Sequence, residues 1–483
     1  MTELQHAAKA TRPRIQPAEE GDRRPLSVSA RLGRLQFHQS GKFRVLQFAD
    51  IQDGPKVSKD TISLIEASLD ATRPDLVIFN GNQIAGYDSA YALTSRKRRW
   101  DARPASASSE ASGERYAAAL EHTRELVRAT IEQLVHPLAD RGVPWAVTFG
   151  NHDFQCGLDN AEIESICREF PGCINPERAA DGTTGIAVKH GVGDMEQDFG
   201  LPEQPVIACA PGTFALSVTD VDRTYDVLGL VLLDSGDYAR SGGYGSPSEA
   251  ALRFLADAPG LMAAQSQQLQ QDRQDEQDSP REPRKTPSTL PCMVFQHFPI
   301  EQYYRLLKPV AATAARAIEG YRNFAGRHFV LNEDKTQPGS YLGEGVSCPD
   351  ADSGEFAILD KAGYFAISAG HDHRNAFVGS VPVGTDGDRQ MMMVASPTSG
   401  FGSYGPVPAK RAARLFEFDI RHPYEPRTQL LEYDELVGKP SAGKAYAYGM
   451  TSESKPDSEG MDLLHRPTWW SKTWNKLVSL FRR

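Results

Sequence analysis

The stretch Thr148-Phe149-Gly150-Asn151-His152-Asp153-Phe154 decides how the rest of the chain is interpreted, because it follows directly on the apolar run from Val143 to Val147. A strand that ends in Gly-Asn-His-Asp delivers an amide oxygen, an imidazole and a carboxylate to one edge of a sheet. The same residues are also typical of a strand-terminating turn, since Gly and Asn both tolerate left-handed backbone. The stretch alone predicts either a functional site or an ordinary turn.

Other predicted strands end in the same kind of cluster. There are four of them: Asp50-Ile51-Gln52, Asn80-Gly81-Asn82, Gln296-His297 and Gly370-His371-Asp372-His373. Residues with helical spacing separate the first three strands, which favours an α/β fold with a largely parallel sheet. Because the carboxyl ends of parallel strands meet at one edge, all five clusters are expected to lie together.

Carboxylate, amide and imidazole ligands without thiolates suit Mn, Fe, Zn or Mg. The number of ligands exceeds what one ion needs, so the clusters predict two divalent ions. Two ions about 3.5–4 Å apart clamp the attacking and leaving oxygens of an in-line displacement at phosphorus. The chemistry predicted from the residues is therefore phosphoester hydrolysis.

In this order the five clusters resemble the calcineurin-like metallophosphoesterases, and the resemblance covers residues from about 43 to 420. Leu233-Asp234-Ser235-Gly236-Asp237 and Gly370-His371-Asp372-His373-Arg374-Asn375 are most similar to the fungal and bacterial branch related to purple acid phosphatases. The resemblance implies a four-layer α/β/β/α sandwich. It also implies that a metal-bound hydroxide attacks a small phosphorylated substrate, which is a phosphomonoester or a small phosphodiester.

The resemblance further implies a role for each site residue. One ion would be held by Asp50, Gln52 and His373, the second by Asn151, His297 and His371, with Asn82 bridging the two. His152 would stabilise charge on the phosphate or protonate the leaving oxygen, and Asp153 would orient its imidazole.

Two residues depart from the family pattern. Gln52 stands where the family usually has His, and its amide oxygen is a tolerable substitute. Asn82 stands where the family has a bridging Asp, and a neutral amide bridges two cations poorly, at a cost of about 10–100-fold or more in affinity or activity. The second ion is therefore expected to bind weakly, unless Asp53 or Asp234 repairs the centre.

Asn82 also supports an alternative function. The chain would then be a degenerate family member that binds a phosphorylated ligand or a partner without efficient turnover. Ala85 stands where the purple enzymes keep a tyrosinate, so no purple Fe(III) centre is expected.

Composition limits the partners and the compartment. The 483 residues carry a net charge of −10, so no nucleic-acid partner is expected, because no basic excess exists to neutralise phosphates. Six dispersed cysteines, no apolar signal segment and no run of 18 apolar residues predict a cytoplasmic protein. If the protein were exported, Cys167 and Cys173 could pair instead.

The ends and two internal stretches are expected to lie outside the main domain, which is predicted over 41–435. The predicted parts are a loose arm at 1–40, disordered insertions near 94–114 and 265–288, a linker at 436–466 and an amphipathic helix at 467–483. The apolar positions of that helix are Trp470, Trp474, Leu477 and Phe481. Such a helix makes peripheral contact with a membrane, docks on a partner or packs on its own domain.

Overall fold

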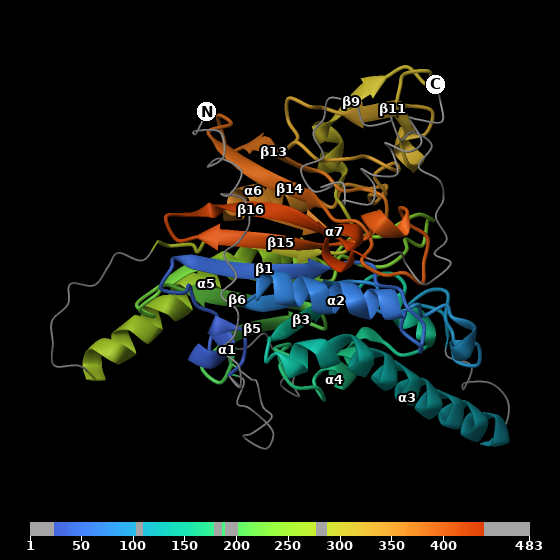
Figure 1. Ribbon diagram of the computed structural model, residues 1–483, viewed down its shortest axis with the longest axis horizontal. Helices are drawn as coiled ribbons and strands as arrows, with labels where there is room; N and C mark the ends of the chain where they lie inside the picture. The colour runs from blue at the N-terminus through green and yellow to red at the C-terminus, as the bar shows by residue number, and fades with distance from the viewer. Residues whose placement is uncertain (1–23, 103–109, 178–185, 189–200, 277–286, 439–483) are drawn as a thin grey trace, which may run out of the picture.

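A computed structural model describes residues 24–102, 110–177, 186–188, 201–276 and 287–438 of the chain. Two large β-sheets make up its centre with helices around them, and one small sheet lies at the periphery (Figure 1). This confirms the predicted mixed α/β class. The helix predicted over 467–483 and most of the linker before it lie outside the described residues.

The first sheet has five strands in the order β16-β15-β1-β2-β3. Its strands are β1 (Lys42–Phe48), β2 (Leu76–Asn80), β3 (Trp145–Thr148), β15 (Ala412–Asp419) and β16 (His422–Glu432). The strands β1, β2 and β3 are parallel, and the helices α2 (Lys59–Thr72) and α3 (Glu110–Asp140) connect them. Three of the predicted clusters therefore follow parallel strands of this sheet at the same edge.

The second sheet has eight strands in the order β13-β14-β12-β8-β7-β6-β5-β4. They are β4 (Ile186–Val188), β5 (Pro205–Ala210), β6 (Thr213–Thr219), β7 (Asp226–Leu233), β8 (Cys292–Gln296), β12 (Tyr364–Ala369), β13 (Val378–Val383) and β14 (Arg389–Ala395). The neighbours β7, β8, β12 and β14 are parallel. The two remaining clusters follow β8 and β12.

Smaller elements decorate these sheets. The third sheet contains β9 (Leu307–Val310), β10 (Ile318–Glu319) and β11 (His328–Leu331). The other helices are α1 (Val28–Leu32), α4 (Asn160–Cys167), α5 (Glu249–Glu276), α6 (Glu355–Ala362) and α7 (Tyr433–Val437). Short 3-10 turns are η2 (Ser89–Tyr91), η4 (Asp153–Cys156), η5 (Glu301–Leu306), η6 (Arg322–Phe324) and η7 (Pro408–Lys410).

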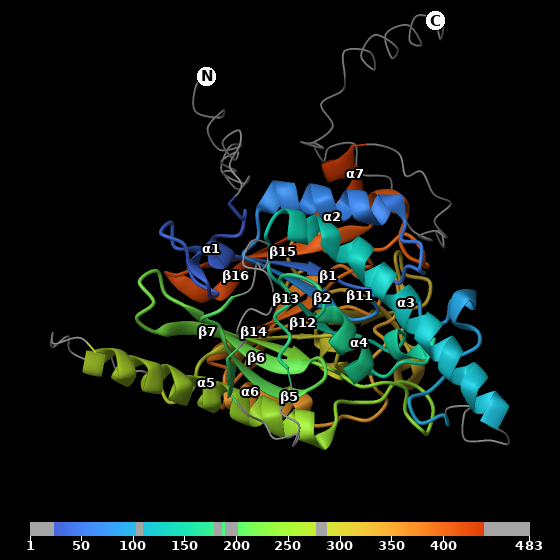
Figure 2. The same cartoon turned by 90° about the horizontal axis from the view of Figure 1, so that it is seen from below.

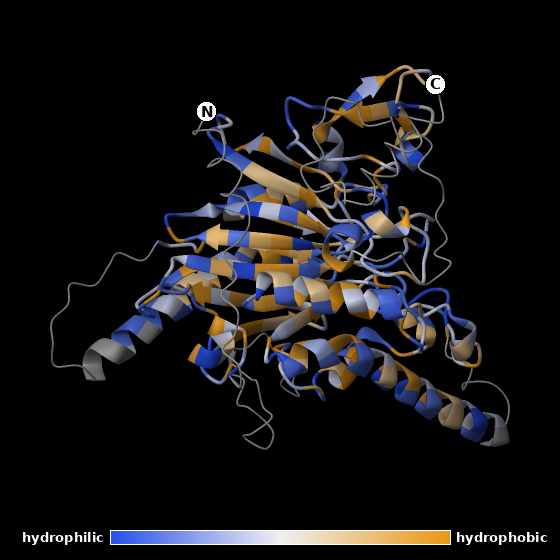
Figure 3. Cartoon of the chain, in the orientation of Figure 1, coloured by the Kyte–Doolittle hydropathy of each residue, from blue (hydrophilic) through white to orange (hydrophobic). Residues whose placement is uncertain are grey.

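Three large apolar clusters and one small one hold the described elements together. One joins side chains of both large sheets, and the rings of Phe295 and Phe416 meet in it edge to face at 5.5 Å. A second joins the five-stranded sheet to α2, α3 and α4, and a third joins the eight-stranded sheet to α5 and α6. Figure 2 shows helices on the outside of the sheets, and Figure 3 shows that the strands are largely apolar while the helices carry both apolar and polar residues. Burial on both faces explains why the strand sequences are continuous apolar runs.

Two predicted boundaries differ from the structure. The loose arm was expected to reach residue 40, but Leu35 and Phe37 are fully buried, and the ring of Phe37 lies 5.9 Å from that of Phe43. The second disordered insertion was expected to begin near 265, but α5 continues to Glu276. Isolated apolar residues in a polar stretch, such as Leu35 and Phe37, decide where the fold begins.

Candidate functional site

The loops that follow the strands contain strained backbone. Among the described non-glycine residues with positive φ are Asp50 at 52°, Gln52 at 45°, Asn82 at 55° and His371 at 70°. Non-glycine residues adopt this left-handed conformation only when the surrounding structure requires it, and such residues cluster at functional sites. The backbone itself therefore singles out four of the predicted residues.

The predicted clusters come together where the two large sheets meet. The backbone N–H of His371 donates to Asp50 Oδ2 at 2.6 Å, and Asn80 Nδ2 donates to the carbonyl of Gln296 at 2.7 Å. The first contact joins a loop of one sheet to a loop of the other, and the second joins the last residues of β2 and β8. All seven predicted ligands are buried. They are Asp50, Gln52, Asn82, Asn151, His297, His371 and His373.

Two imidazoles present the same nitrogen to the site. His297 Nδ1 lies 3.2 Å from the carbonyl oxygen of Asn80, and His373 Nδ1 lies 2.6 Å from that of Tyr404. A carbonyl only accepts hydrogen bonds, so Nδ1 carries the proton and the lone pair of Nε2 faces inward. Metal-binding histidines are commonly held in this way.

On one side of the site an imidazole nitrogen faces a carboxylate oxygen. His373 Nε2 lies 3.3 Å from Asp50 Oδ1. Burial lowers the pKa of His373, but the Asp50 carboxylate outweighs it, so the pKa of His373 lies above its ordinary value. Burial raises the pKa of Asp50, yet His297 and His373 bring the pKa below its ordinary value. Such a pair is stabilised by a proton or a cation between its two atoms.

On the other side the Asn82 amide fills the corresponding space. Asn82 Oδ1 accepts from the backbone N–H of His152 at 2.8 Å, so Nδ2 must point into the site. There it lies 3.1 Å from Asp50 Oδ1, 3.2 Å from Asn151 Oδ1 and 2.9 Å from His297 Nε2. The NH₂ group thus donates where a bridging carboxylate would accept.

The donor set fits one cation better than two. Asp50, Gln52 and His373 offer a carboxylate, an amide oxygen and a free imidazole nitrogen, which suits a single divalent ion. The amide nitrogen of Asn82 carries no lone pair available to a metal, so it does not fit the bridge of a two-ion centre. Within the described residues, no three His, Cys, Asp or Glu side chains are grouped so as to hold a metal ion on their own.

Neither proposed substitute for the bridge is available. Asp53 Oδ2 accepts from Thr61 Oγ1 at 2.6 Å and from the backbone of Ser58 at 3.0 Å, at the start of α2. Asp234 binds Arg99 through both of its oxygens, at 2.9 and 3.1 Å. Each carboxylate already holds an element in place.

Asp153 has a different partner from the one predicted. Its carboxylate accepts from the backbone N–H groups of Asn82, Gln83, Ile84 and Gly150 at 2.8–3.2 Å, and it joins the loops after β2 and β3. Burial raises the pKa of Asp153 to about 7 in spite of these donors. Because the backbone groups surround the carboxylate, it does not orient the imidazole of His152.

Gln155 orients His152 instead. Its Oε1 lies 2.8 Å from His152 Nδ1, and its Nε2 donates to the carbonyl of Lys97 at 3.3 Å. Because the Lys97 carbonyl accepts from the NH₂ group of Gln155, the Gln155 oxygen faces His152. That oxygen only accepts, so the proton of the imidazole lies on Nδ1. Burial lowers the pKa of His152 to about 4, so the ring is neutral at pH 7. Its Nε2 lies 3.4 Å from Asn151 Nδ2.

Several residues near the site were missed by the sequence analysis. The exposed ring of Tyr87 meets His152 edge to face at 4.9 Å, and Tyr404 stacks on His373 at 4.1 Å. Tyr238 accepts from Asn151 Nδ2 at 2.8 Å, and Tyr244 meets His371 at 4.3 Å. The short segment from Asp234 to Tyr244, rich in Tyr and Gly, was the one signal that could have found two of them.

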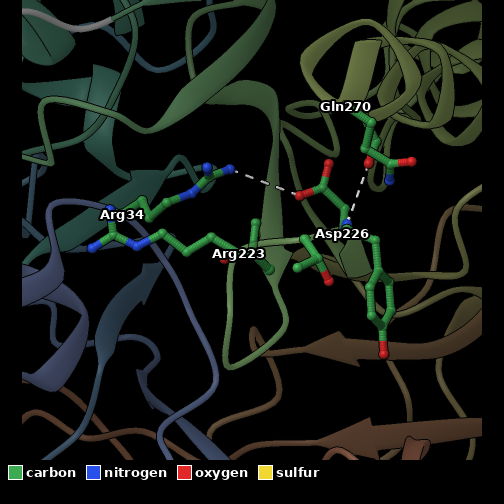
Figure 4. Close-up of a pocket in the computed structure, with 8 residues that line it drawn as sticks. Arg34, Arg223, Asp226 and Gln270 are labelled. Carbon is green, nitrogen blue, oxygen red and sulfur yellow. Dashed lines mark hydrogen bonds and ion pairs between the residues drawn. The ribbon is translucent and has the colours of Figure 1, made fainter. Parts of the chain in front are cut away.

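A separate polar pocket lies away from this site (Figure 4). It is lined by Arg34, Thr219, Arg223, Thr224, Tyr225, Asp226, Ser266 and Gln270, none of which is a predicted site residue. Arg34 Nη2 lies 3.9 Å from Asp226 Oδ1 within it. The pocket does not alter the assignment of the site.

Oxygen and imidazole side chains gathered at the strand ends of a mixed α/β fold are an arrangement also found in metal-dependent phosphoesterases. Residues 43–207 match the family model for calcineurin-like phosphoesterases. Over these residues the chain therefore matches the family that the motifs suggested, which confirms that resemblance.

Curated relatives agree with the family and its branch. The chain is 21% identical to the phosphatase DCR2 of Saccharomyces cerevisiae over 383 residues, which cover 73% of this chain and 47% of the yeast protein. It is 23% identical to the probable inactive purple acid phosphatase 28 of Arabidopsis thaliana, covering 79% of this chain and 77% of the plant protein. The match thus spans about half the length of the yeast relative.

Solved structures show a distant similarity. The structure of PhoD aligns with 82% of this chain and 69% of its own, at 10% identity and a TM-score of 0.39. GAP50, the anchor in the inner membrane complex of Plasmodium, aligns with 82% of this chain and 86% of its own, at 10% identity and a TM-score of 0.36.

No helix in the described part of the chain is long and apolar enough to cross a membrane.

Proposed function

We propose that the chain is a metal-dependent phosphoesterase that hydrolyses a phosphomonoester or a small phosphodiester at a centre with one strongly bound divalent ion. The observation that carries the proposal is the buried contact between His373 Nε2 and Asp50 Oδ1, an imidazole nitrogen and a carboxylate oxygen 3.3 Å apart. A bound divalent ion would polarise the phosphoryl group and lower the pKa of a water molecule.

The protein's own groups supply the rest of the chemistry. Asp50, Gln52 and His373 hold the ion. His152 is neutral at pH 7, and its Nε2, which lies beside Asn151, accepts or returns a proton at the phosphate oxygens. Asn151, His297 and His371 orient the substrate around the Asn82 amide. The two-sheet arrangement is proposed to be the four-layer α/β/β/α sandwich of the family.

A second candidate function is favoured by the orientation of Asn82. If its NH₂ group replaces the second cation, the site binds a phosphorylated ligand without efficient turnover. Three plant relatives are themselves described as probable inactive purple acid phosphatases, which supports this alternative.

Metal titration and hydrolysis assays test both functions. Metal-free wild type, Asn82→Asp and His152→Ala are titrated with Mn²⁺ by calorimetry and assayed with p-nitrophenyl phosphate and bis-p-nitrophenyl phosphate. Wild type is expected to bind one ion tightly and to hydrolyse at least one ester. Asn82→Asp is expected to bind a second ion and to gain about 10-fold or more in rate. The exposed Asn323→Asp is the matched control.

The outcomes separate the functions. Loss of turnover in His152→Ala supports the enzyme. An inert wild type with an active Asn82→Asp variant supports the binding protein without turnover. Two tightly bound ions in wild type would contradict the role given to the Asn82 amide.

The boundaries and the location remain proposals from the sequence. The catalytic domain is proposed to end near 435 and the protein to be cytoplasmic. Membrane contact through Trp470 and Trp474 concerns residues outside the described part of the chain.

A further inference from the structure

A basic and aromatic segment lies beside the candidate site. Ser95-Arg96-Lys97-Arg98-Arg99-Trp100 belongs to the loop before α3. Arg99 fixes this segment, because its side chain binds both oxygens of Asp234 and its backbone N–H donates to Asp237 Oδ2 at 3.0 Å. The carbonyl of Lys97 accepts from Gln155, the residue that orients His152. The segment is therefore attached to the site at two points.

Arg98 lies beside the candidate site, one contact away from Asn151. Its guanidinium lies 3.7 Å over the ring of Tyr238, whose hydroxyl accepts from Asn151 Nδ2 at 2.8 Å. No carboxylate among the described residues forms a salt bridge with Arg98, whereas neighbouring Arg99 has one. One N–H of Arg98 donates to the carbonyl of Lys97, and a guanidinium has five donors.

Exposed aromatic rings border the same site. Tyr87 is 52% exposed and Tyr404 is 38% exposed, although both rings contact site histidines. Trp100 is 37% exposed at the end of the basic segment. Rings left open beside a polar site provide flat faces on which an aromatic group of a ligand can stack.

We propose that Arg98 and Tyr87 form a leaving-group subsite for a nucleotide, a phosphoester that carries an aromatic base and a second phosphate. The inference rests on the proposed function of the same site. One divalent ion balances the two charges of a phosphomonoester. A second phosphate needs a further cation, which Arg98 provides through charge-assisted hydrogen bonds. The exposed Tyr87 ring stacks on the base.

Binding measurements with ligands that contain no P–O–P linkage test the subsite. The full chain is saturated with Mn²⁺ and titrated by calorimetry with inorganic phosphate, methylenediphosphonate and α,β-methylene-ADP. Wild type is expected to bind the ADP analogue about 10-fold or more tightly than phosphate. Arg98→Ala is expected to lose about 10-fold for the analogue and for methylenediphosphonate, but not for phosphate. Tyr87→Leu is expected to lose affinity for the analogue alone.

Arg253→Ala, on the exposed surface of α5, is the matched control and is expected to bind all three ligands as wild type does. Equal affinities in wild type and Arg98→Ala would overturn the proposal, as would a wild type that binds phosphate and the analogue equally. If Arg98→Ala unfolds, Arg98→Gln removes the positive charge and keeps a polar side chain, and unchanged binding of the two larger ligands by that variant would also overturn the proposal. Discrimination by a protein that hydrolyses nothing would support the subsite and contradict the enzyme.

Discussion

The hydrogen-bond chain from Lys97 through Gln155 to His152 determines which imidazole nitrogen faces the site. The backbone carbonyl can only accept, so each later donor and acceptor follows from it. One amide side chain thereby sets the tautomer of the histidine that is proposed to handle protons. This is a property of single atoms, and a single substitution tests it.

Gln155→Glu is expected to raise the pKa of His152. In wild type, burial lowers this pKa to about 4. A carboxylate 2.8 Å from Nδ1 stabilises the imidazolium, so the pKa should rise by about 1 unit or more. NMR titration of the His152 ring in the metal-free protein measures it. Gln155→Leu serves as the control, because it removes the acceptor without adding charge. An identical titration in wild type and Gln155→Glu would contradict the chain.

At this scale the sequence predicted residue types better than orientations. The order of the clusters identified Asn82 as the unusual residue, and it does occupy the centre. Which way its amide points depends on the backbone N–H of His152, 70 residues later in the chain. The role of Asp153 was mistaken for the same reason, since its four donors come from two different loops. Contacts of this kind are not encoded in local spacing.

At the scale of secondary-structure elements, hydrogen bonds to Asp153 hold the ends of β2 and β3 together. The loop after β2 and the loop after β3 each give backbone N–H groups to the same carboxylate. The two loops lie too close together to leave room for a side chain at Gly150. A Cβ at Gly150 would collide with the Asn82 amide, so the glycine permits the close approach of the two loops.

Asp153→Asn is expected to destabilise the fold. An amide has one oxygen, so part of the backbone donors would face its NH₂ group without an acceptor. Buried unsatisfied donors cost about 1–3 kcal/mol each, which predicts a loss of roughly 2–4 kcal/mol in the free energy of unfolding. Urea unfolding of wild type and variant measures it. The exposed Asp257→Asn on α5 is the control and should change stability by about 0.5 kcal/mol at most. A variant as stable as wild type would show that the Asp153 carboxylate does not stabilise the contact between the two loops.

The sequence analysis identified the strands but not the irregular loops. Continuous apolar runs such as the one before Asp50 mark buried parallel strands, and the structure has them where expected. The residues that border the site come largely from loops with no periodicity, including Tyr87, Arg98 and Tyr404. Their positions depend on tertiary contacts such as the pairing of Arg99 with Asp234.

For the whole molecule, one buried carboxyl group outside the metal-binding set influences stability. Glu355 begins α6, is 2% exposed, and its Oε1 has no hydrogen-bond partner in the described part of the chain. Burial raises the pKa of Glu355 from 4.5 to about 7. Between these values the folded chain keeps a proton that the unfolded chain releases. Stability therefore falls as pH rises through this window.

Glu355→Gln is expected to remove this part of the pH dependence, because glutamine is neutral at every pH. Relative to the variant, wild type should lose on the order of 1–3 kcal/mol in free energy of unfolding between pH 4.5 and pH 8. Urea unfolding at several pH values measures both proteins, and the difference between them cancels the other titrating groups. Parallel stability curves would contradict a raised pKa. The exposed Glu301→Gln is the matched control.

The donors of the site come from both large sheets: Asp50, Gln52, Asn82 and Asn151 follow strands of one, while His297, His371 and His373 follow strands of the other. Neither sheet holds a complete set. The site consequently exists only while the two sheets are packed against each other. A ligand bound there contacts residues from both sheets and therefore stabilises their packing. A substitution that weakens the packing between the two sheets should therefore also lower the affinity for the ligand.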